Sequence, residues 1–185
     1  MAMRQACGHR AGQRGVTLIE QIMVVAIVGV LAAIAVPSLA PLLQRNQVQV
    51  AQVEFIAALQ HARGSAALSG KPALFCPSRD GAHCSGETRW ESGWLVGHDP
   101  ARQGQPDATP LRVRAGYGGI TILGDSGRRL VRFQSDGSAS GMTNTWRFCR
   151  RDRPNEALVV VIANSGRVRG AKASAEQAAS CAAAQ

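Results

Sequence analysis

Residues 14–20 read RGVTLIE, and residues 22–36 follow as the uninterrupted apolar run IMVVAIVGVLAAIAV. With its flanking apolar residues the run extends from Val16 to Leu43. At about 1.5 Å of rise per residue, a helix over this stretch is on the order of 40 Å long. That length is enough to cross the apolar core of a bilayer. The stretch therefore predicts a long N-terminal helix whose first half, residues 16–43, lies in a membrane.

A short basic segment, residues 1–15, precedes the run with three arginines and no acid. Positive charge ahead of an apolar helix keeps that end in the cytoplasm. Three interpretations compete: a signal peptide cut after the run, near the AIA of residues 33–35, a plain membrane anchor, or a leader cut before the run. Glu20 favours the last, because a carboxylate at the start of a membrane helix is costly unless it has a partner.

The segment 14–20 resembles the cleavage box of type IV pilins and type II secretion pseudopilins. The resemblance implies that a prepilin peptidase cuts after Gly15 and methylates the new N-terminus at Val16, although Phe or Met is commoner at that position. Glu20 would then be the fifth mature residue, pairing with the terminal amine of a neighbouring pilin during filament assembly. Pro37 falls where many pilins carry a helix-kinking proline, and a proline removes one helical hydrogen bond.

From residue 44 the pattern becomes amphipathic, with apolar residues at helical spacing between Gln, Arg and Glu. The sequence predicts that the helix continues over residues 44–69 and stops at Ser69-Gly70, with Pro72 beyond.

After Gly70, short apolar runs alternate with turns rich in Asp, Asn, Ser and Gly, a pattern typical of β-strands. The runs are Ala73–Cys76, Gly93–Gly97, Leu111–Arg114, Ile120–Leu123, Leu130–Phe133, Thr145–Cys149 and Leu158–Ala163. An Ala/Ser-rich tail, Ala171–Gln185, follows them. The prediction is an α+β, pilin-like fold, in which the long helix packs on a C-terminal antiparallel β-sheet domain spanning residues 70–185.

Of the five cysteines, Cys7 lies in the leader and would be removed, leaving an even number in a domain outside the cytoplasm, where disulfides persist. Four cysteines allow three pairings. We favour Cys76–Cys84, which closes a short loop, with Cys149–Cys181, which ties the tail to a strand and gives it a reason to be ordered.

A metal site built from Cys76, His83, Cys84 and His98 is the alternative use of these residues. The sequence has no C-x-x-C, and the spacings match no common zinc pattern, so no metal is expected. No nucleophile–base pair or carboxylate pair stands out either, and the histidines are scattered. The sequence therefore predicts a protein that is not an enzyme and has no cofactor.

Three segments of the β-rich part resemble the family that joins the pseudopilin GspH with the minor pilins FimT and FimU. They are WESGWLV at 90–96, FQSDGSA at 133–139, and the C-terminal strands around residues 147–149, 158–162 and 166–169. We interpret the tryptophans and Phe133 as core, and Asp136-Gly137 as a turn.

The excess of basic over acidic residues favours an anionic partner. The chain carries +9, of which three charges belong to the leader, and the remaining +6 falls on residues 70–185. Arginine dominates, and a guanidinium can place two hydrogen bonds on one phosphate. The candidate DNA-binding residues are Arg147, Arg150, Arg151, Arg153, Arg167, Arg169 and Lys172.

Residues 166–169 read GRVR, which matches the G-R-x-R motif that FimT-type pilins of naturally competent bacteria use to bind DNA. In an extended segment, alternation puts Arg167 and Arg169 on one side and Val168 on the other. Contacts to phosphates give affinity without sequence readout. The alternative is that these arginines only solvate a strand, or pair with Asp152 and Glu156.

Two functions remain open. One is a minor pilin that captures extracellular double-stranded DNA for natural transformation. The other is a structural minor pilin or pseudopilin that primes filament assembly without a DNA role. Both place the subunit in the inner membrane by a single pass, with its soluble domain in the periplasm, before assembly into the pilus.

Overall fold

In the computed structural model, the backbone is described for residues 17–150 and 153–183, and the side chains for all of these except 35–45, 153–155 and 182. The chain divides into two units, residues 1–44 and 45–185. Helix α1 (Leu18–Ser69) begins in the first unit and ends in the second.

In the first unit, the large apolar side chains of α1 between Leu18 and Ile34 are exposed. A helix of an isolated soluble domain buries an apolar stripe against a core, whereas this helix is apolar on most of its surface. Such a surface is typical of an interaction site. In the part of the chain that the structure describes, no helix has both the length and the apolar content needed to cross a membrane.

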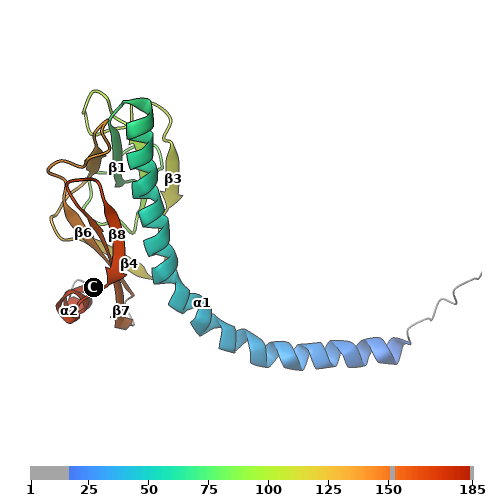
Figure 1. Ribbon diagram of the computed structural model, residues 1–185. Helices are drawn as coiled ribbons and strands as arrows, with labels where there is room; N and C mark the ends of the chain where they lie inside the picture. The colour runs from blue at the N-terminus through green and yellow to red at the C-terminus, as the bar shows by residue number, and fades with distance from the viewer. Residues whose placement is uncertain (1–16, 151–152, 184–185) are drawn as a thin grey trace, which may run out of the picture. The chain divides into compact units, whose positions relative to one another are not determined.

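In the second unit the strands form two four-stranded antiparallel sheets beside the second half of α1 (Figure 1). The first sheet has the order β3-β2-β1-β5 and the second β4-β6-β7-β8. The strands are β1 (Ala73–Pro77), β2 (Gly93–His98), β3 (Arg112–Ala115), β4 (Ile120–Gly124), β5 (Val131–Phe133), β6 (Asn144–Arg150), β7 (Arg153–Ile162) and β8 (Val168–Lys172). Helix α2 (Ala175–Ala183) follows β8.

The second half of α1 joins the two sheets through one apolar stripe. Its buried members recur at helical spacing: Val48, Ala51, Phe55, Ala58, Leu59, Ala62 and Ala66. The Phe55 ring lies edge-on to Phe75 of the first sheet, with centroids 4.7 Å apart, and to Trp146 of the second, at 5.1 Å. Because Phe55 is fully buried between both sheets, its truncation to alanine is expected to cost about 3–5 kcal/mol.

Helix α2 covers the opposite face of the second sheet. Alternation along β6 sends Phe148 into the main core and Cys149 into a smaller cluster with Ala178 and Cys181. The helix starts in a reciprocal cap, in which Gln177 N donates to Ser174 Oγ and Ser174 N donates to Gln177 Oε1. This helix lies in the Ala/Ser-rich tail, and the spacing of Ser174 and Gln177 is that of a capping box.

The predicted α+β, pilin-like fold is confirmed. The strands divide into two sheets, which the local pattern does not reveal because it cannot say which strands pair. Strand β8 falls on the last of the C-terminal segments that the resemblance placed among the strands, and it begins at Val168, the third residue of the G-R-x-R segment.

Candidate nucleic-acid interface

Strand β8 is an edge strand that contains Arg169 of the G-R-x-R segment, and Arg167 lies directly before its first residue. Arg169 pairs with Val161 of β7, while the other side of β8 carries no strand among those described. Arg167 and Arg169 are exposed, and Val168 between them is half-buried against the main core. The two guanidinium groups therefore lie on the face of the sheet that points away from the core.

The turn before β8 can contain only glycine at position 166. Gly166 has a φ of +76°, and a Cβ added there would lie 2.1 Å from the carbonyl oxygen of Gly137. A backbone hydrogen bond from Ala139 N to Asn164 O joins the two loops, and Gly166 N donates to Ala163 O to close the turn before β8. Gly166, the first residue of the motif, therefore packs directly against the backbone of Gly137. This contact fixes the backbone position from which Arg167 continues.

Helix α1 holds β8 near both of its ends. At one end Arg63 Nε donates to Gly137 O at 3.0 Å, beside the Gly166 turn. At the other end Gln52 Nε2 donates to Val159 O at 2.8 Å and to Ala171 O at 3.1 Å. Between them Gly170 faces the helix so closely that a Cβ would lie 2.8 Å from Ile56 Cδ1. The strand is therefore supported from the core side along its length.

Lys172 does not share the arginine face. It has the same parity as Val168 and Gly170, and it lines a groove with Gln49, Gln52 and Glu156 on the α1 side of the strand. Lys172 is exposed there, separate from Arg167 and Arg169.

Arg147 and Arg150 are not available surface cations. Arg147 has a side chain only 18% exposed, and its Nη2 lies 2.7 Å from Asp125 Oδ1. Its Nη1 donates to Ser180 Oγ of α2, so the guanidinium of this β6 residue connects the turn after β4 with α2. Arg150 is 8% exposed. Sequence reasoning grouped these residues with Arg167 because they are near in the chain, but packing has enclosed them.

The backbone of Arg153, another candidate of that group, lies at the far end of β7. Arg153 pairs with Arg150 at the start of β7, whereas Val168 pairs with Ile162 at its end. A strand of ten residues is about 30 Å long. Arg151 and the side chain of Arg153 lie outside the described residues.

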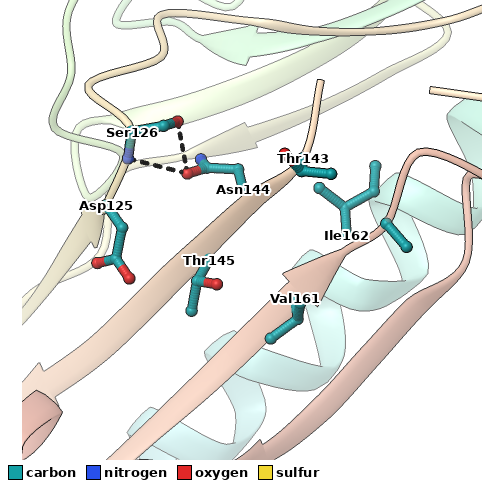
Figure 2. A pocket seen from close by; sticks show the side chains of 8 residues that line it. Asp125, Ser126, Thr143, Asn144, Thr145, Val161 and Ile162 are labelled. Carbon is teal, nitrogen blue, oxygen red and sulfur yellow. Dashed lines mark hydrogen bonds between the residues drawn. The ribbon is translucent and has the colours of Figure 1, made fainter. Parts of the chain in front are cut away.

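A groove of about 470 Å³ runs along the same face of the second sheet as Arg169 (Figure 2). Val161, the partner of Arg169, lines it together with Thr145, and Asn144 accepts hydrogen bonds from Ser126 at its upper edge. The groove contains the Asp125 carboxylate and no cationic residue among its lining. The groove therefore offers no positive charge to an anionic ligand.

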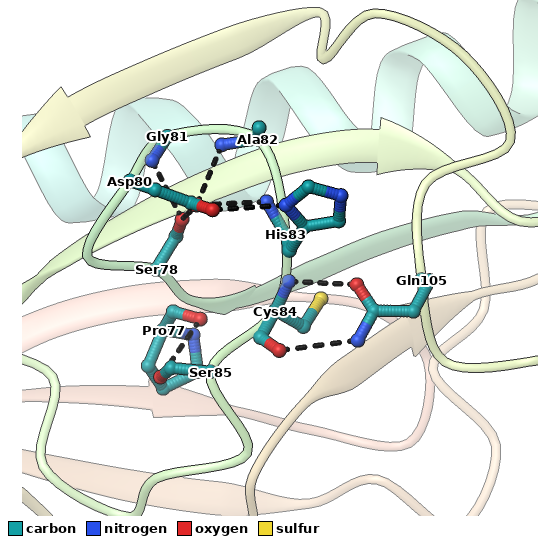
Figure 3. Close-up of polar contacts among 9 residues, drawn as sticks. All are labelled: Pro77, Ser78, Asp80, Gly81, Ala82, His83, Cys84, Ser85 and Gln105. Carbon is teal, nitrogen blue, oxygen red and sulfur yellow. Dashed lines mark hydrogen bonds and ion pairs between the residues drawn. The ribbon is translucent and has the colours of Figure 1, made fainter.

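The disulfides of the structure are Cys76–Cys84 and Cys149–Cys181, the pairing that the sequence favoured, with Cα atoms 5.6 Å and 6.0 Å apart. Cys76 and Cys84 close the loop in Figure 3, where the Asp80 carboxylate accepts hydrogen bonds from His83 Nδ1 and the His83 and Ala82 amides. These bonds, led by the one from the His83 ring, hold the pKa of Asp80 well below its usual range.

The residues considered as a metal site, Cys76, His83, Cys84 and His98, are engaged in other contacts. The sulfurs of Cys76 and Cys84 are bonded to each other, and His98 Nε2 lies 3.1 Å from Ser65 Oγ. Within the described residues, no three His, Cys, Asp or Glu side chains gather in a way that could hold a metal ion.

The predicted processing residues lie at the edge of what the structure covers. Gly15 and Val16 lie outside the described residues. Glu20 is exposed in the first turn of α1, where its N–H donates to Thr17 O at 3.1 Å. Pro37 falls within the bounds of α1, and its side chain is outside the described set. Cleavage, methylation, filament pairing and the helix kink remain predictions.

Comparisons with known proteins agree on one class: proteins with a processed N-terminus and a pilin-like fold. The family model "Prokaryotic N-terminal methylation motif" matches residues 10–36. The model "Type II transport protein GspH" matches residues 51–166, more than half of the chain, and the chain belongs to this family of pilin-like structural proteins.

Individual relatives cover smaller shares. A "Fimbrial protein" of Pseudomonas aeruginosa is 51% identical over 59 residues, which are 32% of this chain and 38% of that protein. The chain thus spans about two fifths of the length of the curated relatives it matches. The crystal structure of the P. aeruginosa type IV minor pilin FimU is similar with a TM-score of 0.57 and 24% identity, covering 68% of this chain and 89% of FimU. A second crystal form of FimU gives a TM-score of 0.56 at 23% identity, covering 66% and 91%.

Proposed function

We propose that this chain is a minor type IV pilin whose soluble domain binds extracellular double-stranded DNA, without sequence preference, for uptake in natural transformation. The observation that carries the proposal is the pair of exposed arginines at the start of a supported edge strand, Arg167 directly before β8 and Arg169 within it. The core side of that strand is occupied by α1, so the arginine face is the one that a large ligand can reach.

The spacing and the charge of the two arginines suit a DNA backbone. Arg167 and Arg169 start from backbone positions about 7 Å apart on one face, since a strand rises about 3.4 Å per residue. Two guanidinium forks at this spacing suit neighbouring phosphates of one DNA strand, and neither reads a base. Binding of this kind releases counterions, so the affinity falls steeply as salt rises.

The same proposal covers how the subunit reaches its site of action. A prepilin peptidase cuts after Gly15 and methylates Val16, and until assembly α1 anchors the chain in the inner membrane by a single pass, with residues 70–185 in the periplasm. In the pilus, Glu20 pairs with the amine of a neighbouring pilin, which neutralises both charges in an apolar setting. Pro37 gives α1 a point at which to bend. N-terminal sequencing of the mature protein tests the processing: a start at Met1 or after Ala35 contradicts it.

DNA binding is tested with the full-length chain in a neutral detergent, using gel shifts of two duplexes of unrelated sequence over a salt series. We expect equal retardation of both duplexes at low salt and loss of binding at high salt. Arg167→Gln with Arg169→Gln should remove most of the binding. A matched control is Arg79→Gln with Arg89→Gln, which removes two exposed arginines near the disulfide loop and changes the net charge equally. Equal losses in both double variants contradict the site.

A second candidate is a structural minor pilin or pseudopilin that primes filament or type II secretion pseudopilus assembly without binding DNA. The match to the type II transport family model favours it. The two candidates are separated by the wild-type gel shift, because only the first requires retardation of DNA at low salt.

A further inference from the structure

Arg63 of α1 lies at the same end of the soluble domain as Arg167, although about a hundred residues separate them in the chain. Arg63 Nε donates to Gly137 O, and a Cβ on Gly166 would lie 3.1 Å from the same nitrogen. Arg63 is exposed. Within the described part of the chain this contact uses only Nε, so both terminal NH₂ groups of the guanidinium remain available to a ligand.

Arg102, in the loop between β2 and β3, reaches the same place from the first sheet. Its Nη2 donates to Gln134 Oε1 at 2.8 Å. Its φ of +56° is uncommon for a residue with a side chain and costs free energy, so the loop must be held in place by other contacts. Buried Asp99 provides them: its backbone oxygen accepts from Arg102 N, and its carboxylate lies 2.6 Å from Arg132 Nη2.

The point of convergence is the tight turn formed by residues 134–138. Gln134 N donates to Ser138 O and Gly137 N donates to Gln134 O, which close the turn. Arg63 and Arg102 both bond to it, and the Ala139–Asn164 hydrogen bond joins it to the turn that leads into Arg167. In Figure 1 the loop after β5 and the turn before β8 lie side by side.

The turn also contains one acid, Asp136. Its carboxylate accepts a hydrogen bond from Ser138 N at 2.8 Å, and hydrogen bonds from Ser138 lower the pKa of Asp136. Asp136 is therefore ionised at neutral pH, and it opposes an anionic ligand. Four exposed arginines, 63, 102, 167 and 169, lie on or near this turn, and we call this group the cationic end. Asp136 contributes one negative charge to it. Such an excess of one sign creates a field that attracts polyanions.

We infer that Arg63 and Arg102 bind phosphates of the same DNA duplex as Arg167 and Arg169. The inference rests on the proposed function and extends it, because the site then crosses from α1 and the first sheet to β8 instead of following β8 alone. Three elements that are distant in the chain supply the contacts, and the 134–138 turn fixes their spacing.

The test compares the full-length chain in neutral detergent with single variants, using the affinity for a fixed duplex and its salt dependence. Arg63→Gln and Arg102→Asn should each weaken binding severalfold and lower the slope of log affinity against log salt by about 0.9, the value for one phosphate contact. Asparagine is chosen at position 102 because it tolerates a positive φ. Asp136→Asn keeps the acceptor for Ser138 N, removes the negative charge and should strengthen binding.

Two controls separate contact from folding. Arg63→Lys keeps the charge and loses the Nε donor to Gly137, so a phosphate contact predicts that it retains most of the affinity, whereas a merely structural role predicts that it fails like Arg63→Gln. Arg79→Gln removes an exposed charge elsewhere and should leave the slope unchanged.

The outcomes distinguish the two claims. If Arg167→Gln with Arg169→Gln loses binding while Arg63→Gln and Arg102→Asn keep the wild-type affinity and slope, this inference is wrong and the proposed function stands. If the wild-type chain does not retard DNA at low salt, both are wrong.

Discussion

Arg147 and Arg169 stand on the same face of the second sheet and have opposite surroundings. Arg147 pairs with Val159 and Arg169 with Val161, so one strand, β7, relates them. Helix α2 covers the first position, where Arg147 contacts Asp125 and Ser180. Nothing described covers the second, at the edge of the sheet. The same side chain is thus a structural cross-link in one place and an exposed cation in the other, and the position of α2 makes the difference.

Removing the Cys149–Cys181 disulfide should have the largest effect on this contrast. The bond closes a loop with a sequence separation of 32. Loop closure of that size contributes about 3–4 kcal/mol to the free energy of unfolding. Cys149→Ser with Cys181→Ser should lower that free energy by a similar amount in urea unfolding and loosen α2, which exposes Arg147. Removal of Cys76–Cys84, with a separation of 8, should cost less. An unchanged unfolding midpoint would show that α2 is held without the bond.

Gly166→Ala should follow, with a loss of about 2–3 kcal/mol, because the new Cβ meets Gly137 O and alanine is strained at a positive φ. The variant keeps both arginines but displaces the turn, so DNA affinity should fall as well. Gly127→Ala is the matched control: Gly127 also has a positive φ, of +62°, and open space around it. Equal stability losses in the two variants would mean that the contact with Gly137 is unimportant.

Arg147→Gln should lower the free energy of unfolding by about 1 kcal/mol, since it removes the contacts of a partly buried guanidinium with Asp125 and Ser180. DNA affinity should change little. Thermal unfolding and the gel shift, measured on the same sample, separate the two quantities. A large loss of DNA binding with normal stability would place Arg147 in the interface and break the contrast with Arg169.

Arg169→Gln should have the smallest effect on stability, within about 0.5 kcal/mol, because an exposed side chain on an edge strand has little to lose. Arg169→Gln should nevertheless weaken the affinity for DNA measurably in the gel shift. A destabilisation as large as that of Arg147→Gln would show that Arg169 supports the fold.

Much of the fold could be predicted from the sequence because the decisive patterns are local. The apolar run of residues 22–36, the helical spacing of Phe55, Leu59 and Ala62, and the alternation around Val168 each depend on neighbours a few residues away. The capping box of α2 was also present and was overlooked. Sheet partners were not predictable, since strand pairing depends on contacts between distant segments.

For the candidate site, the sequence by itself determined that residues 166–169 place two arginines on one side of an extended segment and that residues 70–185 are basic. Only the tertiary structure decided which arginines stay exposed. Packing of α2 enclosed Arg147, and the position of Arg150 in the sheet buried it. The turn at 134–138 holds Arg63 through Gly137 and Arg102 through Gln134, and it is hydrogen-bonded to the turn that precedes Arg167. The physical reason is that strand periodicity fixes a side chain's direction over a few residues, whereas its burial and its neighbours depend on elements that meet only in the folded chain.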